Sequence, residues 1–131
     1  MRNFLLIILI SSCSLLYNCK KVEPQPKSEP EKATGDLRVT VRLYSAAGHP
    51  GSSAKVNVAL SADSLSTGKY ILTKDTDEYG YALFKEISWQ KNTKRTLFVN
   101  AEQANGANTL KGKNSATLTE GRVTNVTIVI E

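Results

Sequence analysis

The amino-acid sequence predicts an all-β fold in which seven short strands form a two-sheet sandwich. Three observations predict it. After residue 35, apolar and polar side chains alternate in several segments, turn-forming residues separate these segments at intervals of about 8 to 15 residues, and no segment has the spacing of an amphipathic helix. The segment 36–131 is long enough to enclose a core between two sheets.

The chain begins with a segment typical of a secretory signal peptide. Arg2 precedes an unbroken apolar run over residues 4–10, and the apolar character resumes at residues 15–16. The whole stretch is shorter than the ~20 apolar residues that a membrane-spanning helix needs. We therefore expect residues 1–18 to be a signal peptide rather than a membrane helix.

Both cysteines of the chain lie in or directly after this segment. Residues 16–19, Leu-Tyr-Asn-Cys, are followed by two lysines and resemble the processing site of bacterial lipoproteins, in the looser form found in Bacteroidetes and spirochaetes. The resemblance implies cleavage before Cys19 and acylation of Cys19. Cys13 fits the strict pattern better but leaves a short signal, so we favour Cys19. An ordinary secreted protein with two incidental cysteines is the remaining alternative.

Residues 20–35 are expected to form a disordered linker. They contain three of the four prolines, mixed charges and almost no apolar side chains, so they cannot bury enough surface to fold. An extended Pro-rich segment of this length would span about 50 Å, at ~3.1 Å per residue. Residues 19–35 are thus expected to be a lipidated tether that holds a β-sandwich domain, residues 36–131, away from a membrane.

The clearest strand is expected at residues 37–44, where apolar and polar side chains alternate with a period of two. A second alternating set is Val56, Val58 and Leu60. A polar connection over residues 61–68 then leads to a short third strand at 69–73.

Residues 76–84 are expected to form a tight turn that runs directly into the fourth strand, which ends near residue 87. Ala82 and Phe84 are two positions apart, so they should point to one face of the sheet. We expect a polar loop at 88–95, a turn at 105–108, and strands at 97–101, 110–119 and 126–130.

Two segments together resemble the carboxypeptidase regulatory-like, transthyretin-like family of β-sandwich modules. One joins Gly48 and Pro50 to an Ala-x-Val strand at residues 54–56, and the other is Thr-Asp-x-x-Gly-x-Ala-x-Phe at residues 76–84. The resemblance implies a seven-stranded, Ig-like sandwich in which Gly80 permits the turn and Phe84 lies in the core. It also implies a non-catalytic role, since these modules are accessory in most of their host proteins.

No constellation in the sequence predicts a metal site, a cofactor or an enzyme. An acidic set has a superficial calcium-loop spacing, but its tyrosine cannot supply the expected ligand and no helices flank it; the set is Asp75, Asp77, Tyr79 and Glu86. His49 is the only histidine and no cysteine follows Cys19, so neither a zinc site nor a paired acid and base can be assembled.

Two residues are candidates for contact or modification. Trp89, in the expected polar loop, could stack on a sugar or a peptide, although a tryptophan just after a strand more often covers the end of a sandwich, which we favour. Residues 63–65, Asp-Ser-Leu, resemble the three-residue O-glycosylation signal of Bacteroidetes, which makes Ser64 a candidate acceptor.

The formal net charge is +5, but the basic residues of the domain form no stripe and have no aromatic residues between them, so we expect no nucleic-acid partner. The sequence favours a lipid-anchored interaction or structural module of the cell envelope, with the membrane and an envelope protein or glycan as partners. Lys20 after the anchor resembles outer-membrane sorting, with the leaflet open. The alternative is a carbohydrate-binding module of a surface glycan-uptake or adhesion system.

Overall fold

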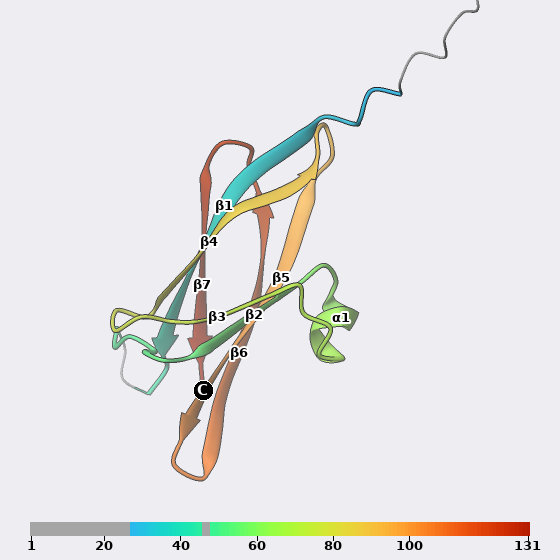
Figure 1. The fold of residues 1–131 in the computed structure, drawn as a ribbon. Helices are drawn as coiled ribbons and strands as arrows, with labels where there is room; N and C mark the ends of the chain where they lie inside the picture. The colour runs from blue at the N-terminus through green and yellow to red at the C-terminus, as the bar shows by residue number, and fades with distance from the viewer. Residues whose placement is uncertain (1–26, 46–47) are drawn as a thin grey trace, which may run out of the picture.

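A computed structural model describes residues 27–45 and 48–131. Two sheets pack face to face as a sandwich (Figure 1), which confirms the expected fold class. The expected signal peptide, Cys13, Cys19 and the first part of the linker lie outside the described residues.

The described residues contain seven strands and one short helix. In chain order these are β1 (Lys32–Leu43), β2 (Lys55–Ala59), α1 (Ala62–Ser66), β3 (Leu72–Asp75), β4 (Tyr81–Gln90), β5 (Arg95–Asn105), β6 (Asn108–Leu118) and β7 (Val123–Ile130). One sheet has the order β4-β1-β7 and the other β3-β2-β5-β6. Strands β1 and β7 run parallel, whereas the other paired strands are antiparallel.

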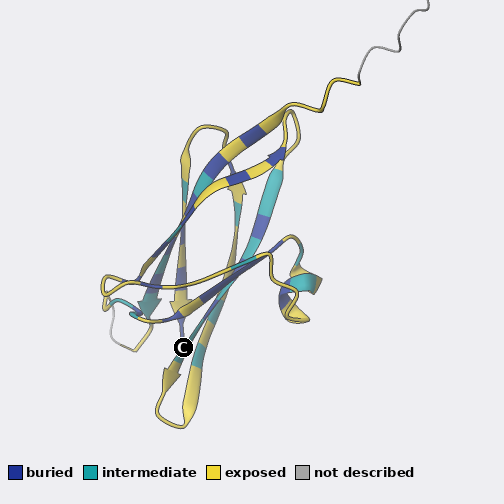
Figure 2. Cartoon of the chain, in the orientation of Figure 1, coloured by how far each residue is buried: buried dark blue, intermediate teal, exposed yellow. Residues whose placement is uncertain are grey.

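The period-2 alternation turns every second side chain of a strand toward the space between the sheets, where apolar residues of both sheets form the core. Buried and exposed residues accordingly alternate along the strands (Figure 2). Leu37, Val39 and Val41 of β1 are fully buried. Ala82 and Phe84 of β4 both lie in this core, as their spacing predicts. The core also includes the alternating apolar residues of β5 and β7, namely Leu97, Val99, Ala101, Val126, Ile128 and Ile130.

Strand β1 begins at Lys32, four residues before the expected start of the domain. Its first residues pair with the end of β4, from Lys32 opposite Gln90 to Gly35 opposite Ile87. Ala33 is 2% exposed and belongs to the core. The end of the expected linker is therefore part of the central strand of a sheet.

Other expected boundaries are also wrong, since β4 continues to Gln90 instead of ending near residue 87, and the second and third strands differ as follows. Leu60 lies beyond the end of β2 and is 48% exposed, because the chain leaves the sheet at Ala59 to enter α1. The third strand, expected at residues 69–73, is observed at Leu72–Asp75.

The turn between β3 and β4 is held by Thr76. Its buried hydroxyl accepts a hydrogen bond from the backbone N–H of Ala54, 2.8 Å away, and donates one to the carbonyl of Gly51. The carboxylate of Asp77 accepts hydrogen bonds from two backbone N–H groups of the same turn, at 2.9 Å each. Both side chains thus satisfy backbone groups that no strand pairs.

Gly80 completes the turn with a φ of +79°, a conformation that favours glycine. Its carbonyl accepts a hydrogen bond from the N–H of Val41 in β1, and a Cβ at this position would lie 2.6 Å from the carbonyl oxygen of Val41. The motif at residues 76–84 therefore joins the turn to the loop before β2 and to β1.

The strands β6 and β7 belong to different sheets but meet at one edge of the sandwich. Lys111 and Glu131 exchange two backbone hydrogen bonds, and the side-chain amide of Asn114 donates to the carbonyl of Thr127. Gly112 lies where a Cβ would collide with the backbone of Val129. A glycine at this position allows the two strands to approach closely.

We predict that Thr76→Val lowers the free energy of unfolding by about 1–3 kcal/mol, because the Ala54 N–H and the Gly51 carbonyl then lose their partner inside the protein. Urea denaturation of the full chain measures the change. Thr117→Val is the matched control, since its hydroxyl bonds only to that of Thr96 at an exposed position, and it should cost less than about 0.5 kcal/mol. Equal losses in the two variants would contradict this role of Thr76.

Candidate functional site

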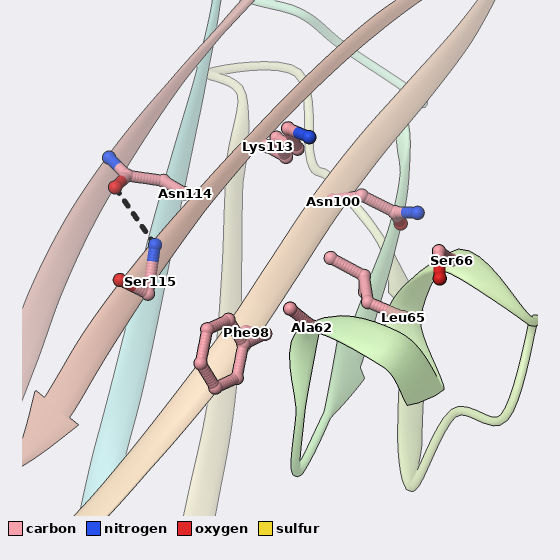
Figure 3. Close-up of a pocket in the computed structure, with 8 residues that line it drawn as sticks. All are labelled: Ala62, Leu65, Ser66, Phe98, Asn100, Lys113, Asn114 and Ser115. Atoms are coloured by element: carbon pink, nitrogen blue, oxygen red, sulfur yellow. Dashed lines mark hydrogen bonds between the residues drawn. The ribbon is translucent and has the colours of Figure 1, made fainter.

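The outer face of the four-stranded sheet is hollowed beside helix α1 (Figure 3). This α1 hollow has a volume of about 460 Å³, which is in the range of small-ligand sites. It is lined by Ala62, Leu65, Ser66, Phe98, Asn100, Lys113, Asn114 and Ser115.

The register between β5 and β6 determines which side chains form the floor of this hollow. In β5 the core residues alternate with Phe98 and Asn100, so these two side chains point to the outer face. Ser115 of β6 is opposite Phe98, and Lys113 is opposite Asn100. The floor thus combines one aromatic ring with polar side chains from both strands.

Helix α1 forms one wall. The side chain of Ser61 accepts a hydrogen bond from the backbone N–H of Ser64, which caps the start of the helix. Leu65 is only 8% exposed, and Ala59 of β2, which points to the same outer face, is fully buried. The short helix therefore covers part of the outer face and leaves the hollow at its side.

A chain of hydrogen bonds under this wall orients Asn100. Thr73 donates its hydroxyl to the side-chain oxygen of Asn57 at 3.0 Å, and the Asn57 amide nitrogen donates to the side-chain oxygen of Asn100 at 2.9 Å. Asn57 is 2% exposed, so its polar atoms need these partners. With its oxygen engaged, Asn100 offers its NH₂ group as a donor to the hollow.

A second hollow adjoins the first and shares Asn100 and Lys113 with it. This β6–β7 hollow has a volume of about 490 Å³ and is also lined by Ala101, Glu102, Lys111, Gly112, Val129 and Glu131. The ammonium of Lys111 and the carboxylate of Glu102 are 3.8 Å apart. The two hollows together follow β5 and β6 from α1 to the end of β7.

Trp89 was expected in a polar loop, but the structure places it in β4, opposite Ala33. It is 6% exposed and belongs to the hydrophobic core, where a Cβ on Gly35 would lie 3.2 Å from its ring. It borders a small surface hollow of about 190 Å³. Stacking on a ligand requires an exposed ring face, which this conformation does not offer; a ligand contact at Trp89 stays a prediction.

Ser64, the candidate glycosylation site, lies in α1 and is half-buried. Its hydroxyl accepts a hydrogen bond from that of Ser61 at 2.9 Å. A glycan at this position stays a prediction.

The acidic set around Asp77 is engaged in the turn, since the Asp77 carboxylate binds backbone N–H groups. Within residues 27–45 and 48–131, no three or more His, Cys, Asp and Glu side chains group as metal ligands would. In the part of the chain that the structure describes, no helix has the length and apolar character needed to cross a membrane.

Exposed tyrosines gather at the end of β1 and the start of β4. Tyr79 is 61% exposed and Tyr81 is 39% exposed. The guanidinium of Arg42 donates to the carbonyl of Tyr79 at 3.1 Å and lies 5.7 Å from the ring centre of Tyr81. Tyr44 continues the ladder with β7, two positions after Arg42, and is 70% exposed. We call these four residues the tyrosine face.

Sequence reasoning missed the α1 hollow, although it contained one signal for it. Ser61 followed by Asp63 in the first turn is a helix N-cap pattern, and it follows directly on a strand. The expected strand at residues 97–101 contains Phe98 and Asn100, but nothing in the sequence shows which strands lie beside them.

No family model, curated protein or solved structure matches the chain. The structure therefore supports a β-sandwich domain of two sheets with no family identified. The likeness to the carboxypeptidase regulatory-like modules rests on the sequence motifs alone.

We predict that Trp89→Ala lowers the free energy of unfolding by about 3–5 kcal/mol, because it removes a large ring from the core. Thermal and urea denaturation of the full chain measure this loss. The exposed neighbour Gln90 provides the control, and Gln90→Ala should leave stability within about 0.5 kcal/mol of wild type. A Trp89→Ala protein as stable as wild type would show that the ring is not part of the core.

Proposed function

We propose that this protein is a lipid-anchored, non-catalytic interaction module of the cell envelope. Its β-sandwich presents the α1 hollow and the adjoining β6–β7 hollow to a partner. The observation that carries the proposal is this pair of hollows, which combines an apolar floor with oriented polar groups in the way that binding sites do.

The chemistry of the α1 hollow supports binding rather than catalysis. Its hydroxyl groups come from Ser66 and Ser115, and no His, Cys, Asp or Glu lines it. The one basic side chain there, Lys113, makes no hydrogen bond to either hydroxyl in the described residues, and the Ser66 hydroxyl is directed to the carbonyl of Asp63. A hydroxyl nucleophile requires a general base within hydrogen-bond reach. His49, the only histidine of the chain, lies in the loop that pairs with Leu43 of β1, in the other sheet.

Anchoring is supported by the sequence around Cys19 and by where β1 begins. Because the first strand begins at Lys32, the extended part of the tether is residues 20–31, which would span about 40 Å at ~3.1 Å per residue. Such a tether holds the hollows clear of the lipid headgroups. The resemblance to outer-membrane sorting favours an outer-membrane location, in either leaflet.

The anchor can be tested by palmitate labelling in the native host. We expect labelling to be abolished by Cys19→Ser and retained in Cys13→Ser, since acylation requires the thiol of the processed cysteine. Labelling that instead follows Cys13 would move the anchor to the earlier site. Absence of label in the wild-type protein would reject the lipid-anchored proposal.

The alternative, a carbohydrate-binding module, is favoured by the tyrosine face rather than by Trp89. Tyr44 and Tyr79 are exposed, and each ring has an apolar face and a polar tip; Arg42 bonds to the backbone carbonyl of Tyr79 and lies over the ring of Tyr81. Such rings can stack on the apolar face of a sugar.

A glycan array with the full chain in non-ionic detergent tests this alternative. It predicts binding to at least one glycan, lost in the Tyr79→Ala variant because the stacking ring is removed. Tyr70→Ala is the control, because Tyr70 is also exposed but precedes β3, in the other sheet. No glycan bound by the wild-type protein, or equal loss in both variants, would reject a carbohydrate site at the tyrosine face.

A further inference from the structure

We propose that the α1 hollow binds the C-terminal carboxylate of a partner polypeptide whose last side chain is apolar. This inference rests on the interaction function proposed above and names the partner chemistry of the same site. Three features carry it: an excess of hydrogen-bond donors, an apolar floor beside these donors, and a second hollow that continues from the same point.

The polar groups that the α1 hollow offers are mainly donors. Asn100 presents its NH₂ group, since its oxygen accepts from Asn57. Lys113 presents an ammonium group, and it takes part in neither of the two ion pairs found in residues 27–45 and 48–131. The amide of Asn114 is engaged at both ends, its nitrogen with Thr127 and its oxygen with the N–H of Ser115. The hydroxyl of Ser66 donates to the carbonyl of Asp63 and that of Ser115 can donate or accept, so Asn100 and Lys113 are the groups that require acceptors from a ligand.

A carboxylate fits this donor pattern. Lys113 and Asn100 are directly opposite each other in the β5–β6 ladder, so their Cβ atoms are about 5 Å apart and one carboxylate can reach both groups. Charge-assisted hydrogen bonds of this kind are stronger than neutral ones. Sugar hydroxyls are a poorer match, because they also donate and no carboxylate lines this hollow.

The apolar part of the hollow lies beside these donors. Figure 3 shows Phe98 and Ala62 close together, with Leu65 next to them and Lys113 at the opposite end. An apolar side chain placed there would cover Phe98 while the carboxylate at its base meets Asn100 and Lys113. This is the arrangement of a C-terminal residue, in which one Cα carries both groups.

The β6–β7 hollow explains why the occupant is a chain and not a free small acid. It begins at Asn100 and Lys113, where the carboxylate would lie, and continues to Val129 of β7 and to Glu131, which follows β7. Glu102 and Lys111 along it offer one acceptor and one donor, as a peptide backbone requires. The residues before the C-terminus would occupy this second hollow.

Isothermal titration of the full chain in non-ionic detergent tests the proposal with three probes. These are the peptide acetyl-Ala-Ala-Ala-Phe with a free carboxylate, the same peptide amidated at its C-terminus, and N-acetylphenylalanine. We expect the free peptide to bind roughly tenfold more tightly than the amide, which lacks the charge. It should also bind roughly tenfold more tightly than N-acetylphenylalanine, which cannot reach the second hollow.

Asn100→Asp is the sharpest variant, because it keeps the oxygen that accepts from Asn57 and replaces the donor with a second acceptor. It should lower the affinity for the free peptide by roughly tenfold or more, and it should change the affinity for the amidated peptide by less than about twofold. Lys113→Gln should lower the affinity for the free peptide by a similar factor. Lys94→Gln, which removes the same charge outside both hollows, should change nothing, and unchanged thermal unfolding confirms that each variant folds.

Four results would overturn the proposal. The first two are no binding of the free peptide to the wild-type protein and equal affinities for the free and amidated peptides. The third is an equal loss of affinity for the free peptide in Lys113→Gln and Lys94→Gln. The fourth is that N-acetylphenylalanine binds as tightly as the free peptide. The last result would assign the hollow to a free small acid. Each outcome is independent of palmitate labelling at Cys19, so failure here and failure of the anchored module are distinguishable.

Discussion

The fold depends on one buried hydroxyl, that of Thr76, which lies where the chain passes from one sheet to the other. It follows Asp75, the last residue of β3 in the four-stranded sheet, and precedes β4 of the three-stranded sheet. By bonding to both Gly51 and Ala54, it holds the loop before β2 against the turn that starts β4. Since the N–H of Gly51 bonds to Val41, the contact extends to β1. The hydrogen bonds of Thr76 and Asp77 therefore make the motif at residues 76–84 a determinant of the fold.

The sequence predicts those features that depend on local alternation. The core positions of β1, β5 and β7 can be predicted from the sequence, because the period-2 pattern is visible within each strand. Features that depend on pairing are not predictable in this way. Ala33 and Gly35 carry no apolar signal, so their place in β1 depends on the distant end of β4, and Trp89 is buried for the same reason.

The candidate site illustrates the same limit. Helix α1 is only five residues long, too short to show a helical period, and the hollow beside it exists only because β5 and β6 pair in one register. Asn57 lies between two valines and gives no sign from sequence that it is buried. In the structure its amide links Thr73 to Asn100, so a polar residue inside the fold determines which group the surface presents.

The position of β1 has a mechanical consequence. The proposed tether would join the domain at the first residue of this strand, which lies in the middle of its sheet between β4 and β7. A pull on the tether is thus directed along β1. Strand β4 pairs with β1 between residues 32 and 40, and β7 pairs with it over residues 36–43, so residues 37–40 are paired on both sides. Because β1 is not an edge strand, sliding it out requires many hydrogen bonds to break together. A tether at this strand would therefore resist force better than one attached to an edge strand.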